Sequence, residues 1–286
     1  MLRKSILFPC AAVAVAWMSL SGAAYAQGTD YTQAVQLGKQ VYEGNPAALA
    51  RLKASAKAGS VAAESVLGSL YQAGSPTLNK DSAEAFKWFK KAAEQGDAEA
   101  QFGLGVMFAN GNGTPQDYAM AARWFIKAAE QGNTAPNFYL GLIYENGLGV
   151  TKNYAEAVKW YAKAAGVPEL VGLKFDLATG GGKEIRPPEN SAQVIRDFSM
   201  SPDLAQSDAA YNLGMMSWNG RGVPVNPVEA YKWFVVADAH GNHMAGYNMR
   251  ILARSMSQKQ IFDALALAAS WEAAHPLQGA GKSSSR

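Results

Sequence analysis

The chain has 286 residues, of which 49% are hydrophobic, 10% aromatic and 17% charged, with 26 basic against 23 acidic side chains. This composition excludes wholesale disorder, and the single cysteine excludes a disulfide framework, a thiolate zinc site and an iron–sulfur cluster. The formal charge of +3 is too small to indicate a nucleic-acid groove.

Residues 1–26 have the pattern of a secretory signal peptide. Arg3 and Lys4 precede an uncharged apolar run from Ile6 to Leu20, and residues 24–26 (Ala-Tyr-Ala) supply a cleavage site. The run is shorter than the ~20 residues that cross a bilayer as a helix. We therefore expect cleavage after residue 26, no stable membrane insertion afterwards, and a periplasmic or secreted product.

A phrase built around tryptophan recurs along the rest of the chain. Trp88, Trp124 and Trp160 are spaced by 36 residues, and Trp233 follows after 73. Each tryptophan is preceded by a Leu-Gly pair and then by a glycine turn. The pairs are Leu67-Gly68, Leu104-Gly105, Leu140-Gly141 and Leu213-Gly214. Such a period predicts a solenoid, in which a helix pair buries its apolar faces only by stacking on its neighbours.

Each unit predicts two helices joined by the glycine turn. In the first helix, Ala100, Leu104 and Phe108 share one face. Gly105 costs about 1 kcal/mol of helix propensity, so we expect another helix to approach closely there. The second helix begins at a cap residue with glutamate three residues later, a capping-box spacing. These pairs are Asp81 and Glu84, Asn153 and Glu156, and Asn226 and Glu229.

The tryptophan shares a stripe of the second helix with a pair of alanines, which predicts a buried packing residue rather than a binding track. On this basis truncation of Trp124 to Ala should cost roughly 3–5 kcal/mol.

The repeats divide the chain as follows. We expect an N-terminal helical half-repeat or cap at 27–59, units at 60–96, 97–132, 133–166, 167–206 and 207–245, capping helices at 246–276 and a disordered tail at 277–286. The unit at 167–206 lacks the tryptophan, with Phe198 in its place, and is predicted to be degenerate. An independent inserted loop is the alternative for that segment.

These motifs resemble the Sel1-like repeat family, a branch of the tetratricopeptide-like α/α solenoids. The second unit matches the family pattern at Ala100, Leu104-Gly105, Phe108, Gly111, Gly113, Asp117, Ala121, Trp124, Lys127-Ala128-Ala129 and Gly132. The resemblance implies an all-α, right-handed α/α solenoid with a C-terminal capping helix. It also implies an exported bacterial binding scaffold that serves as an adaptor, a regulator of envelope signalling or a host-interaction factor.

The sequence contains none of the common catalytic motifs. It has no Ser-x-x-Lys, no Gly-x-Ser-x-Gly and no His-Glu-x-x-His. His240 and His243 are close in sequence, but Gly241-Asn242 is expected to end a helix between them, and a helix C-terminus explains His240 without a metal. We therefore expect no catalytic residue, cofactor or metal. Some cysteine-rich relatives are connected with penicillin binding or β-lactamase activity, so a cell-envelope hydrolase is the alternative. This chain lacks their cysteine pairs.

The first helices carry the candidate binding residues, on the face opposite their Leu-Gly motif. They are Phe102, Phe138, Tyr139, Leu142, Tyr211, Met215 and Trp218. In superhelices of this type the first helices line the concave surface, so these side chains predict a site for a protein or peptide partner. The alternative is that they pack between successive units, since an inner helix can be apolar all round. Sparse charge on this face argues against nucleic acid as a partner.

Overall fold

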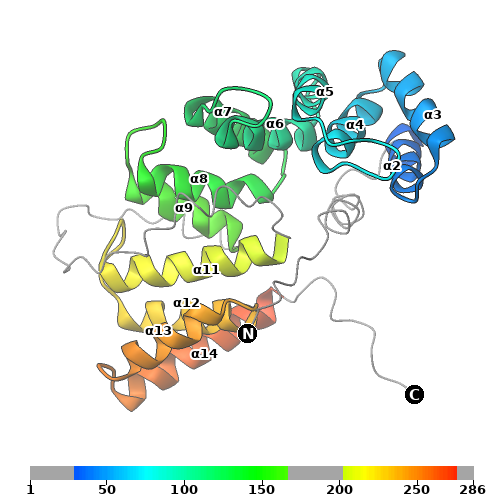
Figure 1. Ribbon diagram of the computed structural model, residues 1–286. Helices are drawn as coiled ribbons and strands as arrows, with labels where there is room; N and C mark the ends of the chain where they lie inside the picture. Colours follow the sequence, from blue (N-terminus) through cyan, green and yellow to red (C-terminus); the bar gives the residue numbers. More distant parts are fainter. Residues whose placement is uncertain (1–28, 167–201, 276–286) are drawn as a thin grey trace, which may run out of the picture. The chain divides into compact units, whose positions relative to one another are not determined.

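The computed structural model describes residues 29–166 and 202–275, and these fold into helices (Figure 1). They form twelve α-helices and no strand, apart from an isolated bridge between Ser75 and Leu78. The helices are α2 (Thr29–Tyr42), α3 (Pro46–Lys57), α4 (Val61–Ala73), α5 (Ser82–Glu94), α6 (Ala98–Asn110), α7 (Tyr118–Glu130), α8 (Ala135–Asn146), α9 (Tyr154–Ala164), α11 (Pro202–Asn219), α12 (Pro227–Ala239), α13 (His243–Ala253) and α14 (Gln258–Ala274). The expected signal peptide and tail lie outside the described residues.

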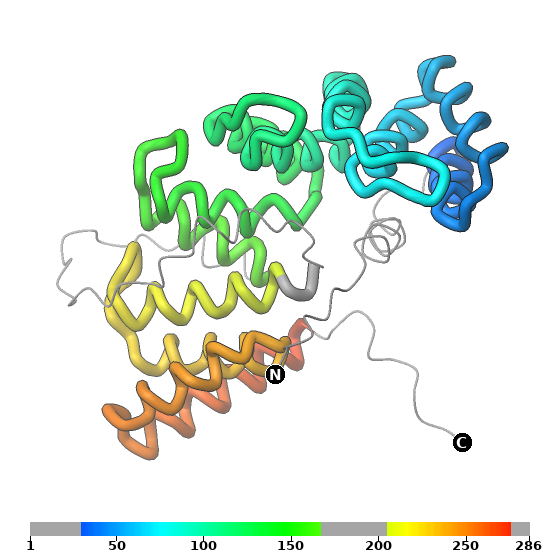
Figure 2. The backbone as a smooth tube through the Cα atoms, in the orientation of Figure 1, coloured from blue at the N-terminus to red at the C-terminus, as the bar shows by residue number. Residues whose placement is uncertain are grey.

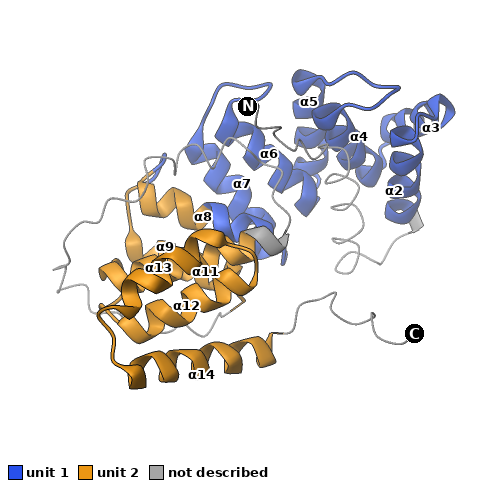
Figure 3. Cartoon of the chain, turned by 60° about the horizontal axis from the view of Figure 1, so that its bottom comes forward, with its two compact units in different colours: residues 1–139, 148–150, 190–201 blue, residues 140–147, 151–189, 202–286 orange. Residues whose placement is uncertain are grey.

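The chain divides into two compact units, which we describe separately (Figure 3). Of the described residues, unit 1 takes 29–139 and 148–150, and unit 2 takes 140–147, 151–166 and 202–275. The division falls inside α8. Unit 1 therefore holds α2 to α7 with the start of α8, and unit 2 holds the rest of α8 and the helices from α9 onwards.

The glycine of the Leu-Gly motif lets the two helices of a pair come into contact. In unit 1, α4 packs against α5 and α6 against α7, and in unit 2, α11 packs against α12 (Figure 2). A Cβ added at Gly105 would lie only 2.6 Å from a ring carbon of Phe125. The same relation joins Gly68 to Phe89, Gly141 to Tyr161 and Gly214 to Phe234. The expectation of a close approach at this glycine is confirmed.

The ring that covers this glycine belongs to the residue after the tryptophan. These rings are almost fully buried: Phe89, Phe125, Tyr161 and Phe234 are at most 3% exposed. Trp88, Trp124 and Trp160 are only half-buried, whereas Trp233 is 2% exposed. The prediction of a buried packing residue is confirmed for Trp233, whereas Trp88, Trp124 and Trp160 are only partly buried and the residue after each of them supplies the buried ring.

Two of the half-buried tryptophans pack between successive helix pairs. Trp88 on α5 lies against the core cluster of α2, α3 and α4, and Trp124 on α7 lies against the cluster of α5 and α6. A lysine three residues later covers the outer side of the ring, with Nζ of Lys127 4.2 Å from the ring centre of Trp124. The tryptophans therefore join neighbouring units, which is what stacking of repeats requires.

The second glycine of each turn sets the contact with the preceding pair. Gly113 has φ of +71°, and a Cβ there would collide with the backbone of Ser82 at the start of α5. Gly149 meets the start of α7 in the same way, and Gly222 meets the start of α9. Because a side chain would be strained by this φ and would also separate the two segments, only glycine suits the position.

The pair α11–α12 stacks directly on α9. The two helices α9 and α11 pack against each other, and Gly222 lies against Tyr154 as Gly149 lies against Tyr118. Nε2 of Gln206 donates to the carbonyl oxygen of Ala165 at 3.5 Å. The described helices on either side of residues 167–201 are thus neighbours in the stack. The expected degenerate unit lies, except for its last residues, outside the described part of the chain.

Residues that cap the first helices also join each first helix to the one before it. Asp97 caps α6 and accepts a hydrogen bond from Oγ of Ser65 on α4 at 2.9 Å. The corresponding pairs are Asn133 with Glu99 (3.2 Å) and Asn242 with Asp208 (2.7 Å). Each bond spans a little more than thirty residues of sequence, so these caps stabilise the stack as well as the helix ends.

The starts of the second helices are capped as the sequence predicts. In three of them the cap side chain accepts a hydrogen bond from the backbone N–H of the glutamate three residues later: Asp81 from Glu84, Asn153 from Glu156 and Asn226 from Glu229. Each glutamate side chain pairs with the lysine three residues further on instead of completing a capping box. A complete box stands at Ser257 and Gln260, where α14 begins.

The last helix closes the C-terminal end through one aromatic residue. Trp271 on α14 is 6% exposed, and its ring centre lies 6.0 Å from that of Trp233 and 5.8 Å from that of His240. His240 follows the last residue of α12, whereas His243 is exposed at the start of α13. Across residues 29–166 and 202–275, no group of three or more His, Cys, Asp or Glu side chains lies together in a way that suits a metal.

Candidate functional site

Four of the predicted binding residues lie in the interior. Phe102, Phe138, Tyr139 and Leu142 are 8%, 2%, 4% and 4% exposed. In unit 1 the ring centres of Phe102 and Tyr139 are 5.7 Å apart, and each lies within 5.7 Å of that of Phe125. The burial of these four side chains agrees with the packing alternative, and they offer no surface to a partner.

The three predicted residues on α11 are partly exposed. Tyr211, Met215 and Trp218 follow one another at four and three residues, which places them on one face of the helix. The ring centres of Tyr211 and Trp218 lie 5.8 Å and 5.9 Å from that of Phe234. Phe234 is fully buried, so these two rings are held from beneath by α12 and keep one side open.

The next first-type helix, α13, adds two exposed side chains that the sequence analysis did not identify. Met244 and Tyr247 are each 55% exposed. Tyr247 lies 36 residues after Tyr211, the same period that separates the tryptophans. Extending the repeat register past residue 245 would therefore have found it.

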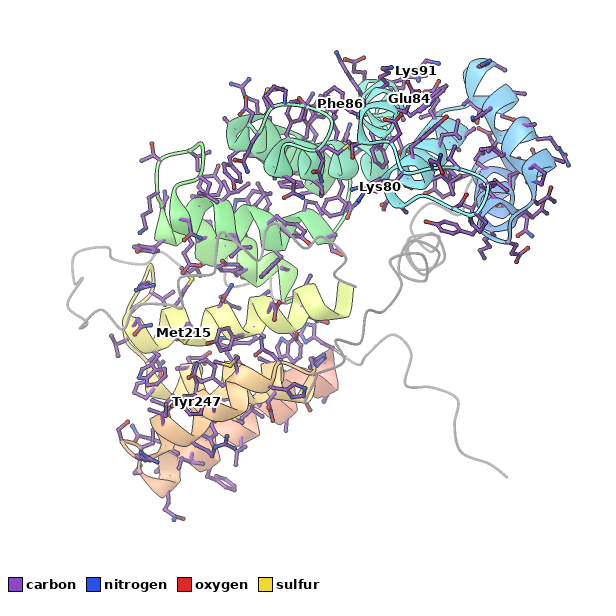
Figure 4. The ribbon with its side chains drawn as sticks, viewed as in Figure 1. Lys80, Glu84, Phe86, Lys91, Met215 and Tyr247 are labelled. Atoms are coloured by element: carbon purple, nitrogen blue, oxygen red, sulfur yellow. The ribbon has the colours of Figure 1, made fainter. Side chains whose placement is uncertain are left out.

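Hydrogen bonds hold α13 against α11 and make one surface of the two helices. Nδ2 of Asn248 donates to Oη of Tyr211 at 3.0 Å and lies 3.3 Å from Sδ of Met215. Figure 4 shows Met215 and Tyr247 on these neighbouring helices. We call this surface the α11–α13 face and define it by Tyr211, Met215, Trp218, Met244 and Tyr247.

Two carboxyl groups that accept hydrogen bonds from helix caps, those of Asp208 and Glu99, have raised pKa values. Burial raises the pKa of Asp208 on α11, and the hydrogen bond from Asn242 opposes the rise. Burial raises the pKa of Glu99 to about 7, and the nearby carboxylate of Asp97 adds to the rise. Both carboxylates bond a cap of the next helix, so the perturbation follows from packing between units.

A serine lies beside Asp97, but its position does not suit catalysis. Oγ of Ser65 donates to Asp97 and the residue is 3% exposed, so a substrate cannot reach the hydroxyl. Burial also raises the pKa of Asp97 and of Glu145. The Glu145 carboxylate accepts a hydrogen bond from Oη of Tyr161 at 2.7 Å. Within the described helices, these carboxyls therefore act as structural acceptors.

No helix among the described residues is long and apolar enough to cross a membrane.

The chain matches the family described as Sel1 repeat at residues 61–97, 98–133, 137–166 and 207–237. No curated protein matches it significantly. Among solved structures, a Sel1 repeat protein from Oxalobacter formigenes is 23% identical, with a TM-score of 0.57 over 82% of this chain and 83% of that one. A protective antigen of uropathogenic Escherichia coli strains with an SLR fold is 22% identical (TM-score 0.37, 95% and 76% covered). A putative Sel1 repeat protein from Klebsiella pneumoniae is 20% identical (TM-score 0.32, 71% and 98% covered).

These matches agree with the helix pairs, the glycine contacts and the stacking described above. The fold is an all-α solenoid of helix pairs, and the four matched segments each contain one pair. The chain therefore belongs to the Sel1-repeat proteins.

Proposed function

We propose that this protein is an exported, non-enzymatic scaffold that binds another protein, in the bacterial cell envelope or outside the cell, through the α11–α13 face. Sel1 repeats generally mediate protein–protein interaction. One observation carries the choice of surface. Phe102 and Phe138 are buried, whereas at the same repeat position Tyr211 is partly exposed and Tyr247 is 55% exposed.

The composition of the face favours a protein partner. Large apolar side chains that stay exposed next to one another are typical of interaction sites. Tyrosine and tryptophan contribute much of the binding energy in protein interfaces, and methionine adapts its shape to a bound segment. The polar contacts of Asn248 keep Tyr211 in place, so little side-chain entropy is lost on binding.

The surface is tested by capture of the partner from the native organism. Tyr247→Ala removes an exposed ring of the face, and Phe262→Ala removes a ring that is 72% exposed on α14 and outside the face. We expect proteins captured by the wild type to be lost with Tyr247→Ala and retained with Phe262→Ala. Equal capture by both variants would contradict the proposed surface.

Export is supported by the signal-peptide pattern of residues 1–26. Fractionation of the native organism, with N-terminal sequencing of the purified protein, tests it. We expect the mature chain to begin at Gln27 and to occur in the periplasm or the medium, and these two fractions separate an envelope regulator from a secreted factor. A chain that retains Met1 in the cytoplasm would be evidence against export.

The non-enzymatic part of the proposal has its own assay. The purified chain is incubated with a chromogenic β-lactam, the substrate class of the alternative hydrolase. We expect no turnover above buffer, and steady turnover would overturn the assignment as a scaffold.

A further inference from the structure

Two arginines on α13 lie beside the α11–α13 face without an opposite charge. Arg250 and Arg254 follow Tyr247 by three and seven residues, a spacing that places them on the same side of the helix. Both are exposed, and neither forms an ion pair with another described residue. The three other Lys and Arg side chains between residues 202 and 275 are paired: Arg221 with Glu145, Lys232 with Glu229 and Lys259 with Asp263.

The charges of the face are divided between its two ends. Asn242 reaches Asp208, and six residues later Asn248 reaches Tyr211, so α11 and α13 run parallel. Asp208 therefore lies at the end where both helices begin, whereas Arg250 and Arg254 lie where α13 ends. A carboxylate on a bound segment is repelled at the first end and attracted at the second.

The face also offers a hydrogen bond to a bound chain. The phenolic oxygen of Tyr211 accepts from Asn248, which leaves its own proton free to bond a carbonyl or carboxylate oxygen of a ligand. Because Asn248 is only 9% exposed, this donor is fixed in place before a ligand arrives.

The number of free cations argues against a membrane or nucleic acid as the ligand. A basic side chain close to an anionic bilayer contributes about 1 kcal/mol, so two arginines give weak adsorption at best. Binding to nucleic acid depends on many phosphate contacts, which two cations cannot supply. An apolar surface with cations at one end is better matched by a short peptide.

We propose that the α11–α13 face binds a peptide segment that combines an apolar side chain with an acidic group, the acidic group lying against Arg250 and Arg254. This inference rests on the proposed function and specifies the chemistry of the partner. The apolar side chain packs among the exposed rings and methionines, and guanidinium groups bind carboxylates with geometric specificity.

The test uses three fluorescent peptides of about eight residues that share a central Leu-Phe pair, flanked by acidic, neutral or basic residues. Binding to the full chain is followed by fluorescence anisotropy. We expect the acidic peptide to bind roughly tenfold more tightly than the neutral one, since each charged hydrogen bond contributes measurably to affinity. The double variant Arg250→Gln and Arg254→Gln should abolish that preference, and added salt should weaken it.

Lys259→Gln serves as the matched control, because Lys259 is an exposed cation of α14 that is paired with Asp263. It should leave the preference for the acidic peptide unchanged. Tyr247→Ala should weaken the acidic and the neutral peptide alike.

Several results would overturn the inference. They are equal binding of the acidic and neutral peptides, tighter binding of the basic one, no binding of any peptide, or a preference that survives the double arginine variant. Binding to vesicles of anionic phosphatidylglycerol in place of the peptides would also overturn it. The proposed binding surface is judged separately, by whether capture of the cellular partner depends on Tyr247.

Discussion

The adjacent residues Trp124 and Phe125 should contribute unequally to stability, in the order opposite to their size. Phe125 is 1% exposed, its ring covers Gly105, and two further rings lie within 5.7 Å of it. Phe125→Ala therefore leaves a closed cavity and should cost about 4 kcal/mol. Trp124 is half-buried and has a lysine over its outer side, so Trp124→Ala should cost about 2 kcal/mol, below the range expected from the sequence.

Urea unfolding followed by far-UV circular dichroism measures both variants. Repeat proteins can unfold in steps, so the transition midpoints are compared only while the slope with denaturant is unchanged. Phe262→Ala, at a ring that is 72% exposed, is the control and should change stability by less than about 0.5 kcal/mol. A Trp124→Ala variant as unstable as Phe125→Ala would refute the assignment of the buried ring.

Three further results are expected from the same packing. Gly105→Ala should destabilise by about 1–2 kcal/mol in urea unfolding, because overpacking against the ring exceeds the gain in helix propensity; a stabilised variant would show that the ring can move away. Glu99→Gln should raise stability by about 1–2 kcal/mol at pH 8, and the gain should vanish near pH 4.5. The pKa of Glu99 rises from 4.5 to about 7 on folding, so the Glu99 carboxyl of the unfolded chain loses its proton first and the stability of the wild type falls between these pH values. Because Glu99 is partly exposed, the stability change is smaller than the pKa difference alone would give. A gain from Glu99→Gln that does not depend on pH would contradict this. Excision of residues 169–205, which joins Pro168 to Gln206, places Gln206 nine residues after Trp160, the spacing from Trp124 to Asn133 at an ordinary junction, and should shift the thermal midpoint little. Loss of the cooperative transition would show that the stack needs the segment.

Local signals in the sequence predict the boundaries of the helices well. Asp81 and Asn153 cap helices where their spacing to glutamate indicates, because capping depends on residues within one turn. The contact at Gly105 is predicted for a similar reason: a costly glycine inside a helix needs a packing explanation. These features rest on chemistry that a short stretch of chain contains.

The facing of side chains is harder to predict. Adjacent residues on a helix point about 100° apart, so the choice between Trp124 and Phe125 as the buried ring depends on how the pair is rotated. Likewise, Phe138 and Tyr211 stand at the same repeat position with similar chemistry, yet Phe138 is buried and Tyr211 is partly exposed. Periodicity within one helix does not describe this difference. The exposed tyrosine of α13 could have been predicted from the sequence, because Tyr247 follows Tyr211 by the repeat period of 36 residues.

The hydrogen bonds that join each cap to the preceding first helix depend on the order of the repeats. The junctions differ in direction: the cap Asp97 accepts from Ser65, whereas the caps Asn133 and Asn242 donate to Glu99 and Asp208. If the repeat that begins with Asp97 were placed after α11, its cap would face Asp208, and two carboxylates would meet where an amide now donates. The repeats are thus not interchangeable. A duplicated or transplanted repeat therefore requires a matching change one repeat earlier if its cap is to keep a hydrogen-bond partner.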